Sequence, residues 1–154
     1  MMNLCSELVK VLSGKTLVTA ESCTGGGIGS AITSVSGSSA VFKGGIISYC
    51  DEVKRDVLGV PEDILKQFGA VSGPVAEAMA VGARKVMDAD IAVSVTGLAG
   101  PGGDDFGNPV GTVYIGYCDQ SRCIHSHFVF SGDREAVRSQ AIKAAIVLIM
   151  EHNV

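Results

Sequence analysis

The residues best suited to chemistry stand at the end of a short apolar segment, where residues 17–27 read Leu-Val-Thr-Ala-Glu-Ser-Cys-Thr-Gly-Gly-Gly. A helical pattern of apolar residues starts directly after them, so the sequence predicts a strand that turns sharply into a helix. Glycine allows such a turn, and the unpaired N–H groups at the start of the helix favour an anion. With Ser22 as nucleophile and the N–H groups around Cys23 to Gly25 as an oxyanion site, the turn suits acyl transfer.

Simpler interpretations of this turn stay open. Ser22 can act only as the cap of the following helix, which for this segment taken alone is the more common role. Cys23 is either a rival nucleophile or a small buried thiol. The segment by itself therefore does not decide between a structural turn and a catalytic one.

Tyr49 and Lys54 flank the end of a second predicted strand and the first turn of a helix for which Asp51 is the predicted cap. In the first turn of a helix, the dipole disfavours a positive charge. Together with partial burial, this position lowers the pKa of Lys54 and lets a neutral amine act as a base. The alternative is a lysine solvated on the helix surface, because Asp51, Glu52 and Asp56 stabilise the ammonium form.

A glycine-rich loop, Thr96 to Gly103, follows a third apolar segment and can hold a phosphate or a sugar with its backbone N–H groups. Arg134, near the start of the last predicted helix, can bind a phosphate through two N–H groups. Arg138 lies four residues further on the same helix face. A plain connecting loop and arginines in surface ion pairs are the alternatives.

We expect no metal ion and no organic cofactor. Asp104 and Asp105 are neighbours in a loop, where acidic residues are more often solvated than bound to a metal. His125 and His127 share one face of a predicted strand, but no acidic or cysteine ligand stands at a metal-binding spacing from them. Both histidines are predicted to be surface residues.

Composition restricts the class of protein. The chain has 154 residues, 47% of them hydrophobic, and is expected to form one domain over residues 1–154. Its net charge is −4 and it has no basic run, so nucleic acid is not an expected partner. No apolar run is long enough to span a membrane, and the beginning shows no signal-peptide pattern. The five cysteines are odd in number and form no CxxC pair, which favours reduced thiols in a cytoplasmic protein.

The elements that position these residues alternate between strand and helix patterns. Strands are predicted at 16–20, 45–50, 91–95, 112–118 and 124–130. Helices are predicted at 4–12, 26–34 and 51–58, after Pro61, after Ser72-Gly73-Pro74, and after Ser131-Gly132-Asp133. The 51–58 helix is expected to turn Val53 and Val57 inward, and the helix after Pro74 to bury Val75, Met79, Gly82 and Val86.

This alternation predicts an α/β fold, a three-layer α/β/α sandwich with a mainly parallel, mixed central sheet. The last two strands are separated by a short connection and add an antiparallel element. In open sheets of this kind, ligands bind beyond the carboxyl ends of the parallel strands. The Ser22 turn, the segment 49–54 and the loop 96–105 are therefore expected to converge on one cleft.

Seven segments together resemble the CinA C-terminal domain family, and they cover essentially the whole chain. The segment with the most characteristic sequence is Thr19-Ala20-Glu21-Ser22-Cys23-Thr24-Gly25-Gly26. The others are Gly37-Ser38-Ser39, Ser48-Tyr49 with Lys54, Gly69-Ala70-Val71-Ser72, Thr96-Gly97-Leu98-Ala99-Gly100-Pro101, Pro109-Val110-Gly111-Thr112-Val113 and Phe130-Ser131-Gly132-Asp133-Arg134.

The resemblance implies a three-layer domain that hydrolyses the carboxamide of nicotinamide mononucleotide to nicotinate mononucleotide and ammonia. The serine of the family falls on Ser22, its tyrosine on Tyr49, its lysine on Lys54 and its arginine on Arg134. Our hypothesis is a serine–lysine amidohydrolase in which Lys54 takes the proton from Ser22. Tyr49 orients the lysine or passes a proton to the departing ammonia.

Substrate-binding roles are expected for residues of the nucleophile turn, the glycine-rich loop and the last helix. These are Glu21, Thr24, Gly25, Gly26, Thr96, Gly97, Gly100 and Arg134. The chain departs from the family pattern at Cys50-Asp51, where Ser-Asn is expected, and at Asn108, where a charged residue is usual. The expected partners are a small nucleotide substrate and further copies of the chain, in a homo-oligomer such as a dimer. The alternative function is a nucleotide-binding or adaptor domain without catalysis.

Overall fold

A mixed sheet of five strands forms the middle of the molecule in the computed structural model, which describes all residues 1–154. The strands are β1 (Leu17–Glu21), β2 (Phe42–Ile47), β3 (Ile91–Gly97), β4 (Thr112–Cys118) and β5 (Cys123–Val129). Their order across the sheet is β2-β1-β3-β4-β5. β1 is parallel to β2 and β3, whereas β4 is antiparallel to both of its neighbours.

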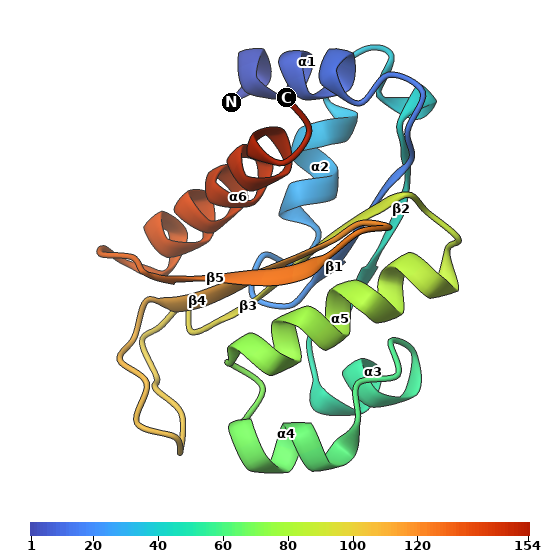
Figure 1. Cartoon of the computed structure of the whole chain (residues 1–154). Helices are drawn as coiled ribbons and strands as arrows, with labels where there is room; N and C mark the ends of the chain where they lie inside the picture. The colour runs from blue at the N-terminus through green and yellow to red at the C-terminus, as the bar shows by residue number, and fades with distance from the viewer.

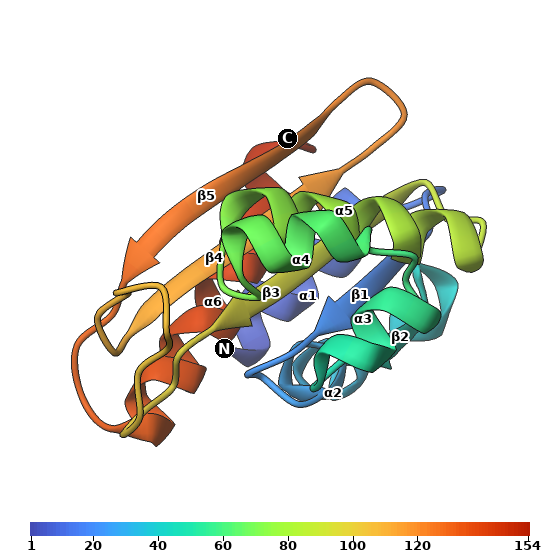
Figure 2. The same cartoon turned by 90° about the horizontal axis from the view of Figure 1, so that it is seen from below.

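Helices cover both faces of this sheet (Figures 1 and 2). One face carries α1 (Met2–Val11), α2 (Gly27–Thr33) and α6 (Arg134–Glu151). The other carries α3 (Asp51–Asp56), α4 (Glu62–Phe68) and α5 (Gly73–Val86), and a short 3-10 turn, η1 (Ser38–Ala40), precedes β2. The predicted three-layer α/β/α sandwich is confirmed. None of the helices is long and apolar enough to cross a membrane.

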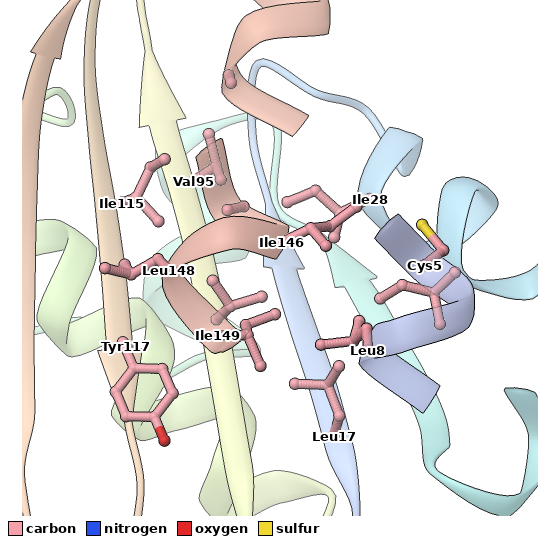
Figure 3. Close-up of a cluster of buried hydrophobic side chains, with 14 of the residues drawn as sticks. Cys5, Leu8, Leu17, Ile28, Val95, Ile115, Tyr117, Ile146, Leu148 and Ile149 are labelled. Carbon is pink, nitrogen blue, oxygen red and sulfur yellow. The ribbon is translucent and has the colours of Figure 1, made fainter. Parts of the chain in front are cut away.

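The hydrophobic core lies in two parts, one on each side of the sheet. The larger part lies between the sheet and α1, α2 and α6, where Ile28, Ile146 and Ile149 are fully buried (Figure 3). Each such side chain contributes about 1.5–3 kcal/mol through burial. The smaller part lies beneath α5. There the predicted burial of Gly82 is confirmed, and a Cβ at this position would collide with the carbonyl of Leu58.

The predictions for β2 and α5 need correction. β2 ends at Ile47, before the predicted limit of residue 50, because its partner strand β1 ends at Glu21, which stands opposite Ile47. Val86 was expected in the buried stripe of α5 but is exposed. It lies in the last turn of the helix, and the following residue, Met87, packs against the smaller core instead.

The prediction that all cysteines are reduced is also wrong. Cys118 and Cys123 form a disulfide, and only Cys5, Cys23 and Cys50 are free. The two paired residues stand directly opposite each other where β4 and β5 meet, with 4.1 Å between their Cα atoms. The strand register brings them together although their spacing forms no CxxC motif. The cytoplasmic location therefore stays a prediction without the support of cysteine usage.

Candidate active site

The turn between β1 and α2 holds Ser22 directly after the carboxyl end of β1. The N–H of Ser22 donates to the carbonyl of Val95 in β3, and the N–H of Gly25 donates back to the carbonyl of Ser22. Gly25 and Gly26 both have positive φ angles, 57° and 97°, which residues with a Cβ rarely adopt. Gly26 is the residue that precedes α2, so the interpretation of Ser22 as the helix cap is wrong.

Glu21 holds this turn together through four hydrogen bonds. Its buried carboxylate accepts hydrogen bonds from the Thr24 hydroxyl at 2.8 Å and from the N–H groups of Ile28 and Gly29 at 2.8 and 3.0 Å. It also accepts from the Thr19 hydroxyl at 3.1 Å. The free N–H groups of α2 that were expected to meet an anion are therefore partly used by the protein itself.

Replacement of Glu21 by glutamine is expected to destabilise the fold by about 2–4 kcal/mol, because charge-assisted bonds are lost and an amide N–H group then faces backbone donors. Chemical denaturation measures the loss. Glu7→Gln is the matched control, since Glu7 forms only an exposed pair with Lys10 and is expected to change stability by less than about 0.5 kcal/mol. Equal stability of the two variants would contradict this role.

Lys54 lies on the inner face of α3 and is only 1% exposed. Its Nζ lies 3.1 Å from the Ser22 Oγ, 2.8 Å from the carbonyl oxygen of Ser48 and 3.5 Å from that of Tyr49. A neutral amine has two hydrogens and one lone pair. If the hydrogens are donated to the two carbonyls, the lone pair is left for the proton of Ser22.

The predicted details of α3 need correction. Asp51 is the first residue of the helix, and the residue that precedes it, Cys50, makes no capping hydrogen bond. Val57 is exposed, whereas Lys54 and Leu58, four residues apart, point inward. The interpretation of Lys54 as a solvated surface residue is therefore wrong.

Burial lowers the pKa of Lys54 below its ordinary value, because the ammonium form loses its hydration. The negative charge of Asp51 opposes this effect. Lys54 takes part in none of the salt bridges of the protein. A buried lysine without a paired carboxylate, in contact with a serine hydroxyl, has the arrangement that a general base requires.

Ser22 and Lys54 line a cavity of about 380 Å³ at the carboxyl ends of the parallel strands. The three predicted loops do converge there. Of the predicted site residues, the structure brings together Ser22, Tyr49, Lys54, Thr96, Gly97, Gly100 and Arg134. Glu21, Thr24, Gly25 and Gly26 lie outside the lining and shape the turn instead. Lining residues that the sequence analysis did not assign to the site include Asp51, Ala70 and Val71.

Arg134 joins two walls of the cavity. Its guanidinium donates to the carbonyl oxygen of Gly100 in the glycine-rich loop and to the hydroxyl of Tyr49, at 2.6 and 3.0 Å. Tyr49 is 60% exposed, and its hydroxyl contacts Arg134 rather than Lys54. Two of the five N–H groups of Arg134 are used in this way, so the others stay available to an anionic ligand.

Arg138 supports the nucleophile turn, a role that the sequence analysis did not assign. Its guanidinium donates to the carbonyl oxygens of Cys23 and Thr24 at 3.0 and 3.2 Å. In a planar trans peptide the C=O and N–H groups point in opposite directions. Arg138 therefore also fixes the direction of the N–H of Thr24. The signal in the sequence was its place one turn after Arg134.

The structure leaves fewer N–H groups for the oxyanion site than the sequence predicts. The N–H of Gly25 is used by the carbonyl of Ser22, whereas the N–H groups of Cys23 and Thr24 donate to no backbone carbonyl. These two groups stay available for an oxyanion. The thiol of Cys23 is buried, and burial raises its pKa to about 11, so it is a poor rival to Ser22 as nucleophile.

No group of three or more His, Cys, Asp or Glu side chains is placed to hold a metal ion. Asp104 instead orders its own loop, since its carboxylate accepts hydrogen bonds from the N–H groups of Phe106 and Asn108 and from the side chain of Asn108. The same Asn108 side chain donates to the carbonyl of Val71 beside the cavity.

Residues 2–152 match the CinA C-terminal domain, and the chain belongs to this family. Over 126 residues it is 52% identical to a CinA-like protein of Geobacter sp. (strain M21), covering 82% of this chain but only 30% of that relative.

A relative of similar size is the nicotinamide-nucleotide amidohydrolase PncC of Pseudomonas putida. It is 51% identical over 130 residues, which cover 84% of this chain and 81% of the relative. A solved CinA superfamily protein from Escherichia coli has a TM-score of 0.95 at 33% identity, covering 98% of this chain and 89% of that one. The competence/damage inducible protein CihA from Agrobacterium tumefaciens also has a TM-score of 0.95, at 36% identity, with 99% and 95% covered.

Proposed function

We propose that this protein is an amidohydrolase that converts nicotinamide mononucleotide to nicotinate mononucleotide and ammonia. The observation that carries the proposal is the contact of 3.1 Å between the buried amine of Lys54 and the hydroxyl of Ser22 inside the cavity. The similarity to the PncC relative supports the choice of reaction and substrate. Conversely, neither a nucleophilic serine nor a buried lysine is needed by a domain that only binds a nucleotide.

The first half of the reaction forms an ester. Neutral Lys54 accepts the proton of Ser22, and the Oγ of Ser22 attacks the carboxamide carbon. The N–H groups of Cys23 and Thr24 stabilise the oxyanion that develops on the carboxamide oxygen. When the C–N bond breaks, the Lys54 ammonium returns its proton to the leaving nitrogen, so that ammonia departs and a nicotinoyl ester of Ser22 remains.

The second half of the reaction consumes water. Lys54 takes a proton from a water molecule, the hydroxide attacks the ester, and the proton returns to the Oγ of Ser22. The carbonyls of Ser48 and Tyr49 orient the amine throughout. The Tyr49 hydroxyl lies at the Arg134 side of the cavity. We assign it to passing the proton of the Lys54 ammonium to the leaving nitrogen in the first half of the reaction, when substrate is bound.

Charges in the cavity fit this substrate. Apart from Lys54, the charged residues that line it are Asp51 and Arg134. Nicotinamide mononucleotide carries an anionic phosphate and a cationic pyridinium ring. In our proposal Arg134 and the N–H groups of the glycine-rich loop bind the phosphate and ribose, and Asp51 lies near the ring.

Replacement of Asp51 by asparagine is expected to move the acidic limb of the pH profile of kcat to lower pH. Asp51 raises the pKa of Lys54, so its removal makes the neutral amine available at lower pH. Activity across pH 5–10 with saturating substrate measures the shift, and Glu52→Gln serves as the control on the same helix turn. A limb at an unchanged pH would contradict the assignment of the base to Lys54.

The test of the proposed function is ammonia release from nicotinamide mononucleotide by the metal-free protein, with the nucleotide product identified by chromatography. Nicotinamide riboside and free nicotinamide should react far more slowly, since they lack the phosphate or the whole nucleotide. Tight binding of the mononucleotide without release of ammonia would overturn the proposal and favour the binding domain.

A further inference from the structure

The hydroxyl of Ser48, directly after β2, is the one buried side-chain nitrogen or oxygen of the protein that makes no hydrogen bond. The whole residue is buried. Buried hydroxyl groups nearly always have a partner, and an unpaired one costs free energy. An alanine would fill the same place without this cost, so the presence of the hydroxyl requires a reason.

The backbone of Ser48 already belongs to the active site. Its N–H donates to the carbonyl of Glu21, which extends the pairing of β2 with β1 by one residue. Its carbonyl oxygen lies 2.8 Å from the Nζ of Lys54. The hydroxyl and this carbonyl belong to the same residue, so the Oγ lies within about 5 Å of the carbonyl oxygen in every rotamer.

The hydroxyl also lies on the same face of the sheet as Lys54. Side chains alternate along a strand, so Ser48 points to the same face as Ile46, which packs against the smaller core. The helix that carries Lys54, α3, covers this face (Figure 1). Rotation about the Cα–Cβ bond of Ser48 therefore moves its Oγ on the side of the sheet where the amine lies.

Lys54 needs more hydrogen-bond acceptors after it takes up a proton. The neutral amine has two hydrogens, whereas the ammonium has three and no lone pair. In the reaction one of the three is passed on to the leaving nitrogen, and the carbonyl of Ser48 holds another. The third has only the carbonyl of Tyr49 at 3.5 Å, beyond the usual length of such a bond. Lys54 is 1% exposed, so bulk water does not supply a better acceptor.

We infer that Ser48 is a positioning residue for the base, and that its hydroxyl turns to accept the third hydrogen of the Lys54 ammonium. The role in catalysis rests on the proposed function, but the same ammonium also forms in the free protein at low pH. A neutral hydroxyl stabilises an ammonium less than a carboxylate does. It therefore supports the charged form without preventing the return of the proton.

The hydrogen bond can be separated from the charges around the amine. Asp51 opposes the loss of hydration of Lys54, and its charge is unaffected by a change at Ser48. A changed titration of Lys54 in a Ser48 variant therefore reports on the hydroxyl alone. The titratable and charged groups near the amine, from α3, the nucleophile turn and α6, are Asp51, Cys50, Cys23 and Arg134.

Titration of Lys54 in the free protein tests the inference. Protein labelled with ¹³C at the lysine Cε is followed by NMR, and the signal of Lys54 is the one that is missing in Lys54→Met. Ser48→Ala should lower the pKa of Lys54 by about one pH unit, because the ammonium loses an acceptor. Ser48→Thr keeps the hydroxyl and should stay close to the wild type. Ser38→Ala, at a buried serine of η1 outside the cavity lining, is the control and should change nothing.

Ammonia release from nicotinamide mononucleotide gives a second measurement. Ser48→Ala should lower kcat by about tenfold to a hundredfold and leave KM within about threefold. At high pH, where the amine is neutral, its melting temperature should stay equal or rise, since an unpaired hydroxyl is removed.

An unchanged pKa of Lys54 in Ser48→Ala would overturn the inference. So would an equal loss of kcat in Ser48→Ala and Ser48→Thr, because the shape of the side chain rather than its hydroxyl would then matter. A wild-type chain that releases no ammonia would refute the proposed function instead, and the titration would still decide whether Ser48 supports the ammonium.

Discussion

Replacement of Ser22 by alanine is expected to lower kcat on nicotinamide mononucleotide by about 10⁴-fold or more, the scale of loss when a nucleophile is removed from a serine hydrolase. Binding of the nucleotide should change little, because the residues proposed to bind the phosphate and ribose lie on other elements. Single-turnover kinetics and calorimetric titration with the substrate measure the two effects separately.

Cys23→Ser is an informative control for this prediction. If Ser22 is the nucleophile, Cys23→Ser keeps most of the activity, and thiol reagents do not inhibit a Cys50→Ser background in which the exposed thiol is absent. Full activity of Ser22→Ala, lost on treatment with a thiol reagent, would instead assign the chemistry to Cys23.

Replacement of Lys54 by methionine has two expected effects of opposite sign. The general base is lost, so kcat should fall by about 10³-fold, within the range for such groups. The apolar side chain has a similar length but needs no hydration, so the melting temperature at pH 7 should stay equal or rise. A stability gain together with a loss of activity separates a strained functional residue from a structural one.

The stability difference between Lys54→Met and the wild type should depend on pH in a defined direction. In the wild type the folded state holds Lys54 with a lowered pKa, whereas in the unfolded chain its pKa is about 10.4. Between these values the unfolded state binds more protons, so wild-type stability rises with pH. The stability advantage of Lys54→Met over the wild type should be largest below the pKa that Lys54 has in the folded state, and it should disappear near about pH 10.4. Melting curves from about pH 6 to about pH 10.5 will measure this difference. A constant difference would mean that the pKa of Lys54 is not lowered.

The sequence allowed the order of the elements and the place of the site to be predicted. The apolar runs before Ser22, Tyr49 and Thr96 do end at the same edge of the sheet, because parallel strands that alternate with helices bring their carboxyl ends together. For the same reason the sequence predicts that the Ser22 turn and the glycine-rich loop lie at this end of the strands.

Burial and long-range contacts could not be read from local patterns. The acidic residues next to Lys54 indicate a solvated helix surface. Only the position of α3 beside the cavity buries the lysine side chain. Glu21 resembles a ligand-binding residue until α2 is seen to donate two N–H groups to it. The disulfide depends on the register of two strands, which a spacing rule between cysteines does not contain.

The contacts of Arg134 and Arg138 have a consequence for biosynthesis. Both residues belong to α6, the last helix of the chain, and each holds a loop that the ribosome has made far earlier. A nascent chain that has emerged only as far as β5 already contains Ser22 and Lys54, but the peptide groups beside the serine have no guanidinium to hold them. The competent enzyme is therefore completed only when the final helix has emerged and docked, and shorter translation products should be catalytically silent.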